Sequence, residues 1–389
     1  MTGTSPLDGI VVADFSRVLA GPLATSTLAD LGAEVVKVER PGTGDDTRAW
    51  GPPWTETGSS YFAGANRSKK SVELDLRDPA DLRVAEDLVA RADVLVENFR
   101  TGTLDRLGLG YGRARELNPG LVYCSVTGFG SGAGADLPGY DFVVQAVGGL
   151  MSITGSPDGD PTKVGVALVD VLTGKDAVIG ILAALADRGR TGLGQHVEVN
   201  LLSSLLGGLA NQASAYLSVG VAPRRLGNRH PSIAPYETLR CRDRLLAVAC
   251  GNTGQFVRLA KALDLGSLVE DPRFATNAGR VEHRKELAGA LEAVLAGHDA
   301  EHWQRVLTEA DVQVGMVGDL GDAVRRAEEL GLRPTLALPA PHAPQVRHPV
   351  TYSRSTTREP TPPPTLGEHS GEVRAWLAGL STGPDITTA

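Results

Sequence analysis

Short apolar segments alternate with longer helical segments through the first half of the chain, and this alternation limits the fold more than any other feature. The segments with strand character are residues 10–14, 34–39, 93–97 and 120–126. The helical segments between them include residues 22–31 and 79–91. Strands separated by helices of this length imply βαβ units and a parallel sheet. We therefore expect an α/β fold with a large Rossmann-like domain.

The second half of the chain predicts a smaller domain inserted before a return to the first. Strand character at residues 195–200 is followed by an apolar helical stretch and then by a change of composition near residue 227. A stretch rich in Pro and Thr begins at residue 333, and a helical segment follows it. The expected parts are a large CoA-binding domain over 1–200, a connector over 201–227, a small α+β domain over 228–332, and a return connector with a C-terminal helix of the large domain over 333–389.

Asp170 is the most informative single residue, because it is a lone carboxylate between the apolar run 164–169 and a long helical pattern. Asp is a favoured N-cap residue, and the helix dipole stabilises its negative charge. Burial among apolar neighbours would instead raise its pKa. A partly dehydrated carboxylate is also a suitable nucleophile for covalent catalysis. From this segment alone, Asp170 is either a helix cap or a nucleophile, or both.

Charge and cysteine content exclude several classes of function. The 389 residues carry a formal net charge of −8, which argues against a nucleic-acid partner because phosphate binding needs surplus basic residues. Cys124, Cys241 and Cys250 are odd in number and lack C-x-x-C spacing, so neither disulfides nor a metal site is expected. With no secretory signal pattern and no apolar stretch of membrane-spanning length, we expect a cytoplasmic protein without a membrane partner.

Three loops after expected strands have the character of ligand sites. The turn from Asp14 to Pro22 places a glycine and a proline at the start of a helix, but it lacks the G-x-G-x-x-G fingerprint. Basic side chains at Arg40 and Arg48 beside a glycine-containing turn are suited to phosphates, although they are equally consistent with a solvated loop. The stretch 97–102 offers an aromatic ring beside an amide and a guanidinium group, which suits a purine or an extended chain.

Read together, these clusters resemble the family III CoA-transferases of the CaiB/BaiF type, the group that contains formyl-CoA:oxalate and carnitine CoA-transferases. The resemblance rests on residues 6–10, 14–15, 20–22, 31–41, 44–45, 66–75, 92–99, 104–108, 117–119, 191–195, 271–274 and 366–369. It implies that Asp170 attacks an acyl-CoA thioester to form a mixed anhydride and CoA thiolate. The thiolate then forms an enzyme thioester, and an incoming carboxylate takes the CoA. Coenzyme A is thus expected as part of the substrate, with no tightly bound cofactor.

The resemblance also implies contacts with the CoA substrate. Arg40 would meet the nucleotide phosphates, and Asn98 and Phe99 would contact the adenine or pantetheine region. Arg77 stands where the family often has Lys, which keeps the charge but changes the hydrogen-bond geometry. The residues expected to line the ADP portion are Leu74, Arg77, Arg106 and Leu107.

A glycine loop of the small domain closes over the thioester in relatives. Asn252, Gly254 and Gln255 match this loop, although the run is less glycine-rich here than in formyl-CoA transferase. Leu19 stands where that enzyme has Gln near the acyl group. Both differences separate this chain from the oxalate-specific pattern.

Two other functions are consistent with the same scaffold. The α-methylacyl-CoA racemases share the aspartate but use a preceding His as partner acid or base, and Tyr140 stands at that position here. Because a phenol with a pKa of about 10 is a poor base near neutrality, we rank transfer above racemisation and expect Tyr140 to shape the acyl pocket. A non-catalytic acyl-CoA-binding protein is the third reading, and the retained aspartate argues against it.

The acceptor and the assembly follow from the resemblance alone. The stretch 227–236 resembles relatives that use dicarboxylates, so Arg229 or His230 would pair with a distal carboxylate. The alternative for His230 is a loop histidine bonded to the backbone. Family relatives form homodimers in which two ring-like chains interlock, and we expect the same assembly here.

Overall fold

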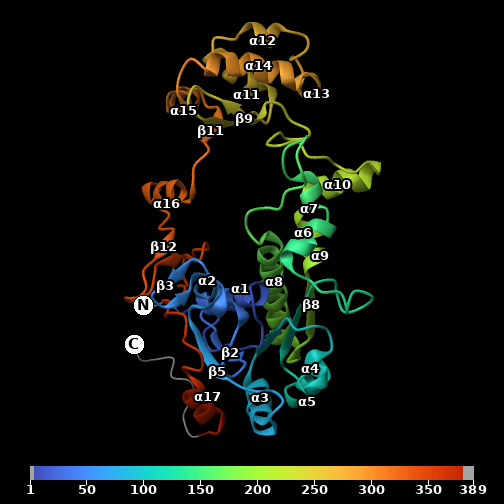
Figure 1. Ribbon diagram of the computed structural model, residues 1–389, viewed down its shortest axis with the longest axis vertical. Helices are drawn as coiled ribbons and strands as arrows, with labels where there is room; N and C mark the ends of the chain where they lie inside the picture. Colours follow the sequence, from blue (N-terminus) through green and yellow to red (C-terminus); the bar gives the residue numbers. More distant parts are fainter. Residues whose placement is uncertain (1–3, 380–389) are drawn as a thin grey trace. The chain divides into compact units, whose positions relative to one another are not determined.

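The computed structural model describes residues 4–379 (Figure 1). Its contacts divide the chain into two compact units. The first unit combines the stretch through Leu150 with Val164–Val221 and the part from Arg333 onward. The second unit consists of Met151–Lys163 and Ala222–Leu332.

A six-stranded parallel sheet forms the centre of the first unit. Its order is β5-β2-β1-β6-β7-β8, and every neighbouring pair is parallel. The strands are β1 (Val11–Asp14), β2 (Glu34–Glu39), β5 (Lys69–Glu73), β6 (Val94–Glu97), β7 (Val122–Thr127) and β8 (His196–Asn200). The chain moves outward from β1 through β2 to β5, then returns to β6 and moves the other way, as in a Rossmann fold. The α/β class predicted from the alternation is confirmed.

Helices connect these strands and cover the sheet. The longer ones are α1 (Ala20–Asp30), α2 (Ser60–Asn66), α3 (Pro79–Arg91), α5 (Tyr111–Leu117), α6 (Asp141–Val147), α8 (Leu168–Thr191), α9 (Leu201–Gly208), α10 (Ala210–Val219) and α17 (Ser370–Leu377). The short elements are η1 (Asp46–Ala49), β3 (Trp54–Thr55), β4 (Gly58–Ser59), α4 (Thr103–Arg106), β12 (Thr335–Leu336) and β13 (Gln345–Val346). The short helix α7 (Leu150–Ile153) spans the point in the chain where the first unit gives way to the second. The start of α3 shows local sequence control, because the Asp78 carboxylate accepts the N–H groups of Ala80 and Asp81 and Pro79 occupies the first turn.

One hydrophobic core joins the sheet to α3 and α17. Leu88 of α3, Val373 and Leu377 of α17, and Leu95 of β6 are all buried in this cluster. The helix α17 packs on α3 and β5, although almost three hundred residues separate α3 from α17 in the chain (Figure 1). The chain therefore returns to the large sheet at its C-terminal end, as predicted.

The helix α8 corrects one expectation about Asp170. Residues 164–167 form no strand, the helix begins at Leu168, and Asp170 lies in its first turn. The N-cap position is Ala167, which makes no side-chain capping bond, so the reading of Asp170 as the helix cap, one of the alternatives left open, is excluded. The helix continues past Gly189 to Thr191, with Gly192 in the left-handed conformation after it.

The second unit has a smaller antiparallel sheet covered by helices. The sheet order is β11-β10-β9, formed by β9 (Tyr236–Arg240), β10 (Leu245–Ala249) and β11 (Gln313–Met316). The helices are α11 (Thr253–Ala262), α12 (Ser267–Glu270), α13 (Asn277–Glu282), α14 (Arg284–Leu295), α15 (Ala300–Glu309) and α16 (Leu320–Glu329). Phe256, Leu291 and Trp303 belong to its separate core, so the predicted α+β character is confirmed.

The unit boundaries differ from the boundaries expected from composition. Residues 151–163, expected in the large domain, cluster with the second unit, and residues 201–221, expected as a connector, cluster with the first unit as α9 and α10. Cys124, Cys241 and Cys250 are free and buried. Within residues 4–379, no helix combines the length and apolar character needed to cross a membrane.

Candidate functional site

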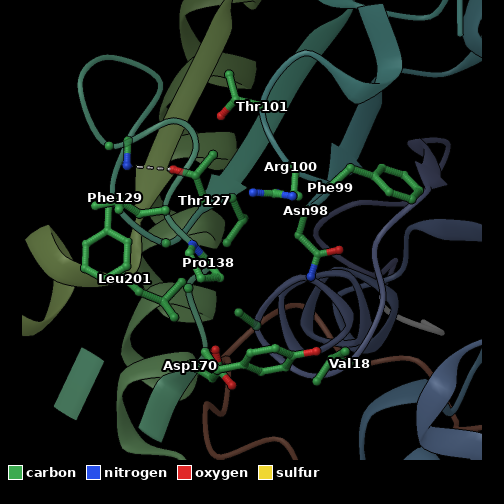
Figure 2. A pocket seen from close by; sticks show the side chains of 18 of the residues that line it. Val18, Asn98, Phe99, Arg100, Thr101, Thr127, Phe129, Pro138, Asp170 and Leu201 are labelled. Atoms are coloured by element: carbon green, nitrogen blue, oxygen red, sulfur yellow. Dashed lines mark hydrogen bonds between the residues drawn. The ribbon is translucent and has the colours of Figure 1, made fainter. Parts of the chain in front are cut away.

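A cavity of about 430 Å³ lies at the carboxyl ends of β1, β6 and β7 in the first unit (Figure 2). The strands β1 and β6 are neighbours from which the chain continues in opposite directions along the sheet, and this switch point is where open α/β sheets bind ligands. Five residues predicted from the sequence line the cavity together: Leu19, Asn98, Phe99, Tyr140 and Asp170. The sequence had placed them in four separate segments, and the sheet topology brings them to one edge.

Asp170 reaches this cavity from the first turn of α8. Burial, and secondarily the charge of Asp141, raise the pKa of Asp170 to about 7. Of the two opposing effects expected at Asp170, burial therefore outweighs the stabilisation of its charge at the start of the helix. Near neutral pH the Asp170 carboxyl group is therefore only partly ionised, and its carboxylate form is more basic than an ordinary aspartate.

Asp141 provides the cap that α8 lacks at Ala167. One carboxylate oxygen of Asp141 accepts the N–H groups of Val169 at 2.7 Å and Asp170 at 3.2 Å. The other accepts the side-chain amide of Gln145 at 2.6 Å. Asp141 therefore fixes the start of α8 and places a second negative charge beside Asp170.

The wall contributed by the β1–α1 loop is tied to the β6 loop. Asn98 accepts the backbone N–H of Arg17 at 2.9 Å and donates its amide to the backbone oxygen of Arg17 at 2.6 Å. The Arg17 guanidinium group lies 5.9 Å from the centre of the Phe99 ring. The next residue, Val18, has a φ of 70°, a left-handed conformation that costs a β-branched residue about 1–3 kcal/mol.

The basic residues near this edge have different roles. The guanidinium groups of Arg17 and Arg40 both pair with the Asp46 carboxylate, at 2.9 and 3.8 Å. Arg40 therefore lies close to Arg17, which lines the cavity. Both guanidinium groups are largely exposed and suit phosphate binding. Arg48 is different, because it forms two bonds with the buried carboxylate of Glu39 and its guanidinium group is occupied there.

The four residues expected along the ADP portion do not line the cavity. The side chain of Leu74 is buried in the core of the first unit, and Leu107 packs against the same core. Arg77 is exposed. Arg106 is also exposed and donates to the hydroxyl of Thr103 at 3.1 Å. Their roles in CoA binding remain predictions.

The residues expected to bind a distal carboxylate lie in the second unit. Arg229 is 3.5 Å from Glu237 and lines a separate cavity of about 750 Å³ within that unit. The ring of His230 accepts the backbone N–H of Ser232 through Nδ1 and packs near the ring of Tyr236. The backbone N–H of His230 donates to the backbone oxygen of Tyr236. This bonding matches the alternative reading of His230 as a loop histidine.

The glycine-loop residues also lie in the second unit, at the start of α11. Asn252 caps this helix by accepting the N–H of Gln255 at 3.0 Å. The side chain of Gln255 accepts the N–H of Gly251 at 2.6 Å. Gly254, between them, is exposed. The loop is thus held by its own side chains, and its part in substrate binding remains a prediction.

Two residues near Asp170 were missed by the sequence reasoning. Asp141 directly follows Tyr140 in the segment compared with the racemases, so its position was a signal that could have been used. Tyr61 had no such signal. Burial, followed by the charges of Asp170, Asp141 and Asp45, raises the pKa of Tyr61 to about 12, so its phenol stays protonated.

The chain is similar to known proteins over nearly its whole length. Residues 7–370 match the family model for CoA-transferase family III. The succinate–glutarate CoA-transferase of Agrobacterium fabrum is 43% identical over 387 residues, covering 96% of both chains. The succinyl-CoA:glutarate CoA-transferase of Mus musculus is 42% identical over 376 residues, covering 95% of this chain and 85% of the relative. The crystal structure of a CAIB/BAIF family protein from Brucella suis is 42% identical with a TM-score of 0.87, covering 96% and 100% of the two chains.

Proposed function

Because the chain belongs to CoA-transferase family III, we propose that it moves coenzyme A from a dicarboxylic acyl-CoA to a second small dicarboxylate, with Asp170 as the nucleophile. The observation that carries this proposal is the half-buried Asp170 carboxylate at the switch-point cavity, with its pKa raised to about 7. The relatives named for succinate and glutarate support a dicarboxylate of four or five carbons as acceptor.

The first half-reaction releases the donor acid. An oxygen of Asp170 attacks the thioester carbonyl, the carbon–sulfur bond breaks, and CoA leaves as a thiolate. The thiolate then attacks the aspartyl carbonyl of the mixed anhydride. The carbon–oxygen bond breaks, the donor leaves as a carboxylate, and the enzyme holds CoA as an aspartyl thioester.

The second half-reaction runs the same steps in reverse with the acceptor. The acceptor carboxylate attacks the aspartyl thioester and releases CoA thiolate, forming a new mixed anhydride. The thiolate attacks the acceptor carbonyl, which restores the Asp170 carboxylate and yields the new acyl-CoA. Each step exchanges similar bonds, so no step needs a cofactor or an external proton donor.

The other cavity residues would bind and orient the substrate. Asn98 and Phe99 line the route toward the exposed Arg17 and Arg40, which suits a pantetheine chain leading to nucleotide phosphates. Tyr140 is exposed at the cavity beside Asp170 and would contact the acyl group. Coenzyme A would enter only as part of the substrate, and the buried free thiols suit a reducing cytoplasm.

We also propose that the protein works as an interlocked homodimer. Large apolar side chains are exposed on several helices of the first unit, including Phe142 of α6, Ile179 of α8, and Leu217 and Val219 of α10. Exposed apolar surface of this kind marks a protein interface. Analytical ultracentrifugation should give twice the mass of one chain, and a monomer at micromolar concentration would contradict the proposed assembly.

The transfer itself is tested by incubating the protein with succinyl-CoA and a panel of dicarboxylates, followed by mass spectrometry of the thioesters. We expect glutaryl-CoA to form, and Asp170→Ala to abolish its formation. Hydroxylamine added during turnover should leave a hydroxamate on residue 170. If an α-deuterated 2-methylacyl-CoA instead exchanges its label with water while no CoA is transferred, the protein is a racemase. CoA-thioester binding without either reaction would indicate a binding protein.

A further inference from the structure

The loop between β1 and α1 is held through its backbone by side chains from other segments. The N–H of Ser16 donates to Asp14 at 2.9 Å, and the oxygen of Ser16 accepts the Lys37 ammonium group at 2.8 Å. Arg17 is bonded through both its backbone groups to Asn98, as described above. The N–H of Val18 lies 3.3 Å from each carboxylate oxygen of Asp45. Three successive residues are therefore fixed from outside the loop.

Val18 is the residue of this loop whose backbone most needs such support. Its left-handed φ of 70° is a conformation that β-branched residues avoid. Strained residues of this kind persist where the surrounding structure over-determines them, and they cluster at functional sites. Val18 and Asp170 both line the same cavity, and both are labelled in Figure 2.

Asp45 is held in place by a buried cation. The Lys37 ammonium group is 3.0 Å from Asp45, and the side chains of both residues are almost fully buried. Burial by itself would lower the pKa of Lys37, but the charges of Asp14, Asp45 and Glu39 raise it above its ordinary value, so the group stays cationic. A buried ion pair contributes little to stability compared with apolar side chains of similar volume. Lys37 donates to the backbone oxygen of Ser16, and Asp45 accepts the backbone N–H of Val18. Holding this loop is therefore a structural role that accounts for the burial of the pair.

The path of the chain links this pair to the wall of the cavity. Leu19 and Ala20 directly follow Val18 and also line the cavity. A rotation of Val18 to an ordinary negative φ would redirect both residues. The loop is tightly packed at this point, because a Cβ atom added to Gly21 would overlap the side chain of Ser16. Asp45 bonds the residue of this loop whose conformation is least favourable.

We propose that Asp45, charged and oriented by Lys37, is a positioning residue that keeps Val18 in its left-handed conformation and so fixes the cavity wall that receives the acyl group opposite Asp170. The inference rests on the proposed transferase function, and it assigns acyl-group placement to a pair outside the cavity. Loss of the Asp45 charge should lower kcat for acyl transfer, while the affinity for the CoA portion changes little.

A double-mutant cycle of Asp45→Asn and Val18→Gly tests the proposal. In the native background we expect Asp45→Asn to lower kcat at least 10-fold and to change KM for the acyl-CoA by less than about 3-fold. Glycine adopts a left-handed φ without strain, so in the Val18→Gly background the same Asp45→Asn change should lower kcat by no more than about 3-fold. The control is Glu56→Gln, an exposed carboxylate that does not line the cavity, for which kcat should stay within about 2-fold. Equal losses from Asp45→Asn in both backgrounds would overturn the proposal.

A stability measurement covers the case in which Asp45→Asn does not fold or the native protein shows no transfer. Val18→Gly alone should leave the thermal midpoint unchanged or raise it, because the relief of strain offsets the greater freedom of glycine in the unfolded chain. A midpoint lowered by more than about 5 °C would show that Val18 is not strained and would overturn the proposal. Absence of transfer in the native protein, with the midpoint result as expected, would instead count against the proposed function alone.

Discussion

The charge of Asp141 should set part of the pKa of the proposed nucleophile, and Asp141→Asn tests this. The pKa of Asp170 is raised from 3.8 to about 7, with burial as the larger cause and Asp141 as the smaller. Asp141 therefore accounts for less than half of this rise in the pKa of Asp170. A contribution of about one unit, equivalent to about 1.4 kcal/mol, is a reasonable working value.

This value gives a measurable change in the ionised fraction of Asp170. With the pKa lowered by about one unit, the ionised fraction at pH 6 would rise from about one tenth to about one half, roughly a 5-fold increase. At pH 7 it would rise from about one half to about nine tenths, less than 2-fold. The rising limb of kcat/KM against pH reports ionisations of the free enzyme, so this limb should move down by about one unit in Asp141→Asn.

The assay is the pH dependence of kcat/KM for the acyl-CoA donor, followed by mass spectrometry of the product thioester. The asparagine oxygen can still accept the N–H groups of Val169 and Asp170, but its amide would face the amide of Gln145. One hydrogen bond is therefore rearranged, at a cost of roughly 1–2 kcal/mol in stability. Asp136→Asn, an exposed carboxylate in the preceding loop, is the control and should leave the limb in place. If the limb of Asp141→Asn also stays near pH 7, the charge of Asp141 does not control Asp170.

Three further changes have defined outcomes. Asp170→Asn should stabilise the fold in urea unfolding by roughly 2 kcal/mol at pH 8 and by almost nothing at pH 4. The raised pKa of the Asp170 carboxyl group lowers the stability of the native protein progressively as pH rises from 3.8 to about 7, and asparagine removes this penalty. Equal effects at both pH values would contradict this. Gly174→Ala should lower both the thermal midpoint and kcat, because the added Cβ atom would lie 2.8 Å from the backbone oxygen of Ala20 at the start of α1. The control is Gly189→Ala in the same helix, whose Cβ atom would meet nothing within 4 Å, so this change should be neutral or stabilising. Leu88→Ala should lower the free energy of unfolding by about 2–5 kcal/mol, since Leu88 is fully buried in the core of the first unit, and a loss below about 1 kcal/mol would mean that this core repacks.

Local patterns predicted the elements of the sheet closely. The strand at 34–39 and the helix at 79–91 occur at the expected residues. Both depend on residues that are adjacent in the sequence, since the strand is rich in β-branched residues and the helix begins with an Asp cap followed by Pro. The reading of Asp170 as the cap of α8 was excluded for the opposite reason. Asp141, which caps this helix, comes from 29 residues earlier, and no local pattern shows such a partner.

The candidate site was predictable where it depends on topology. Parallel strands present their carboxyl ends at one edge of a sheet, so the loops that carry Leu19, Asn98 and Phe99 could have been placed at the same edge from the strand pattern. The family resemblance carried by these segments is confirmed. The apolar run before Asp170 already indicated that burial would raise its pKa, but the contribution of Asp141 was not predictable, because that charge is brought to Asp170 only in the folded chain. Tyr61 was not predictable either, since its position near the carboxylates is set by packing alone.

The distribution of the first unit along the chain has a consequence for biosynthesis. Its core is completed by Val373 and Leu377 of α17, which leave the ribosome only after both units have been translated. Until then, the apolar surface of α3 that faces α17 stays uncovered in the nascent protein. Exposed apolar surface of this kind promotes aggregation and engages chaperones. A chain that stops before residue 370 should therefore accumulate as insoluble material, even though it contains every strand of the large sheet and the aspartate at the cavity.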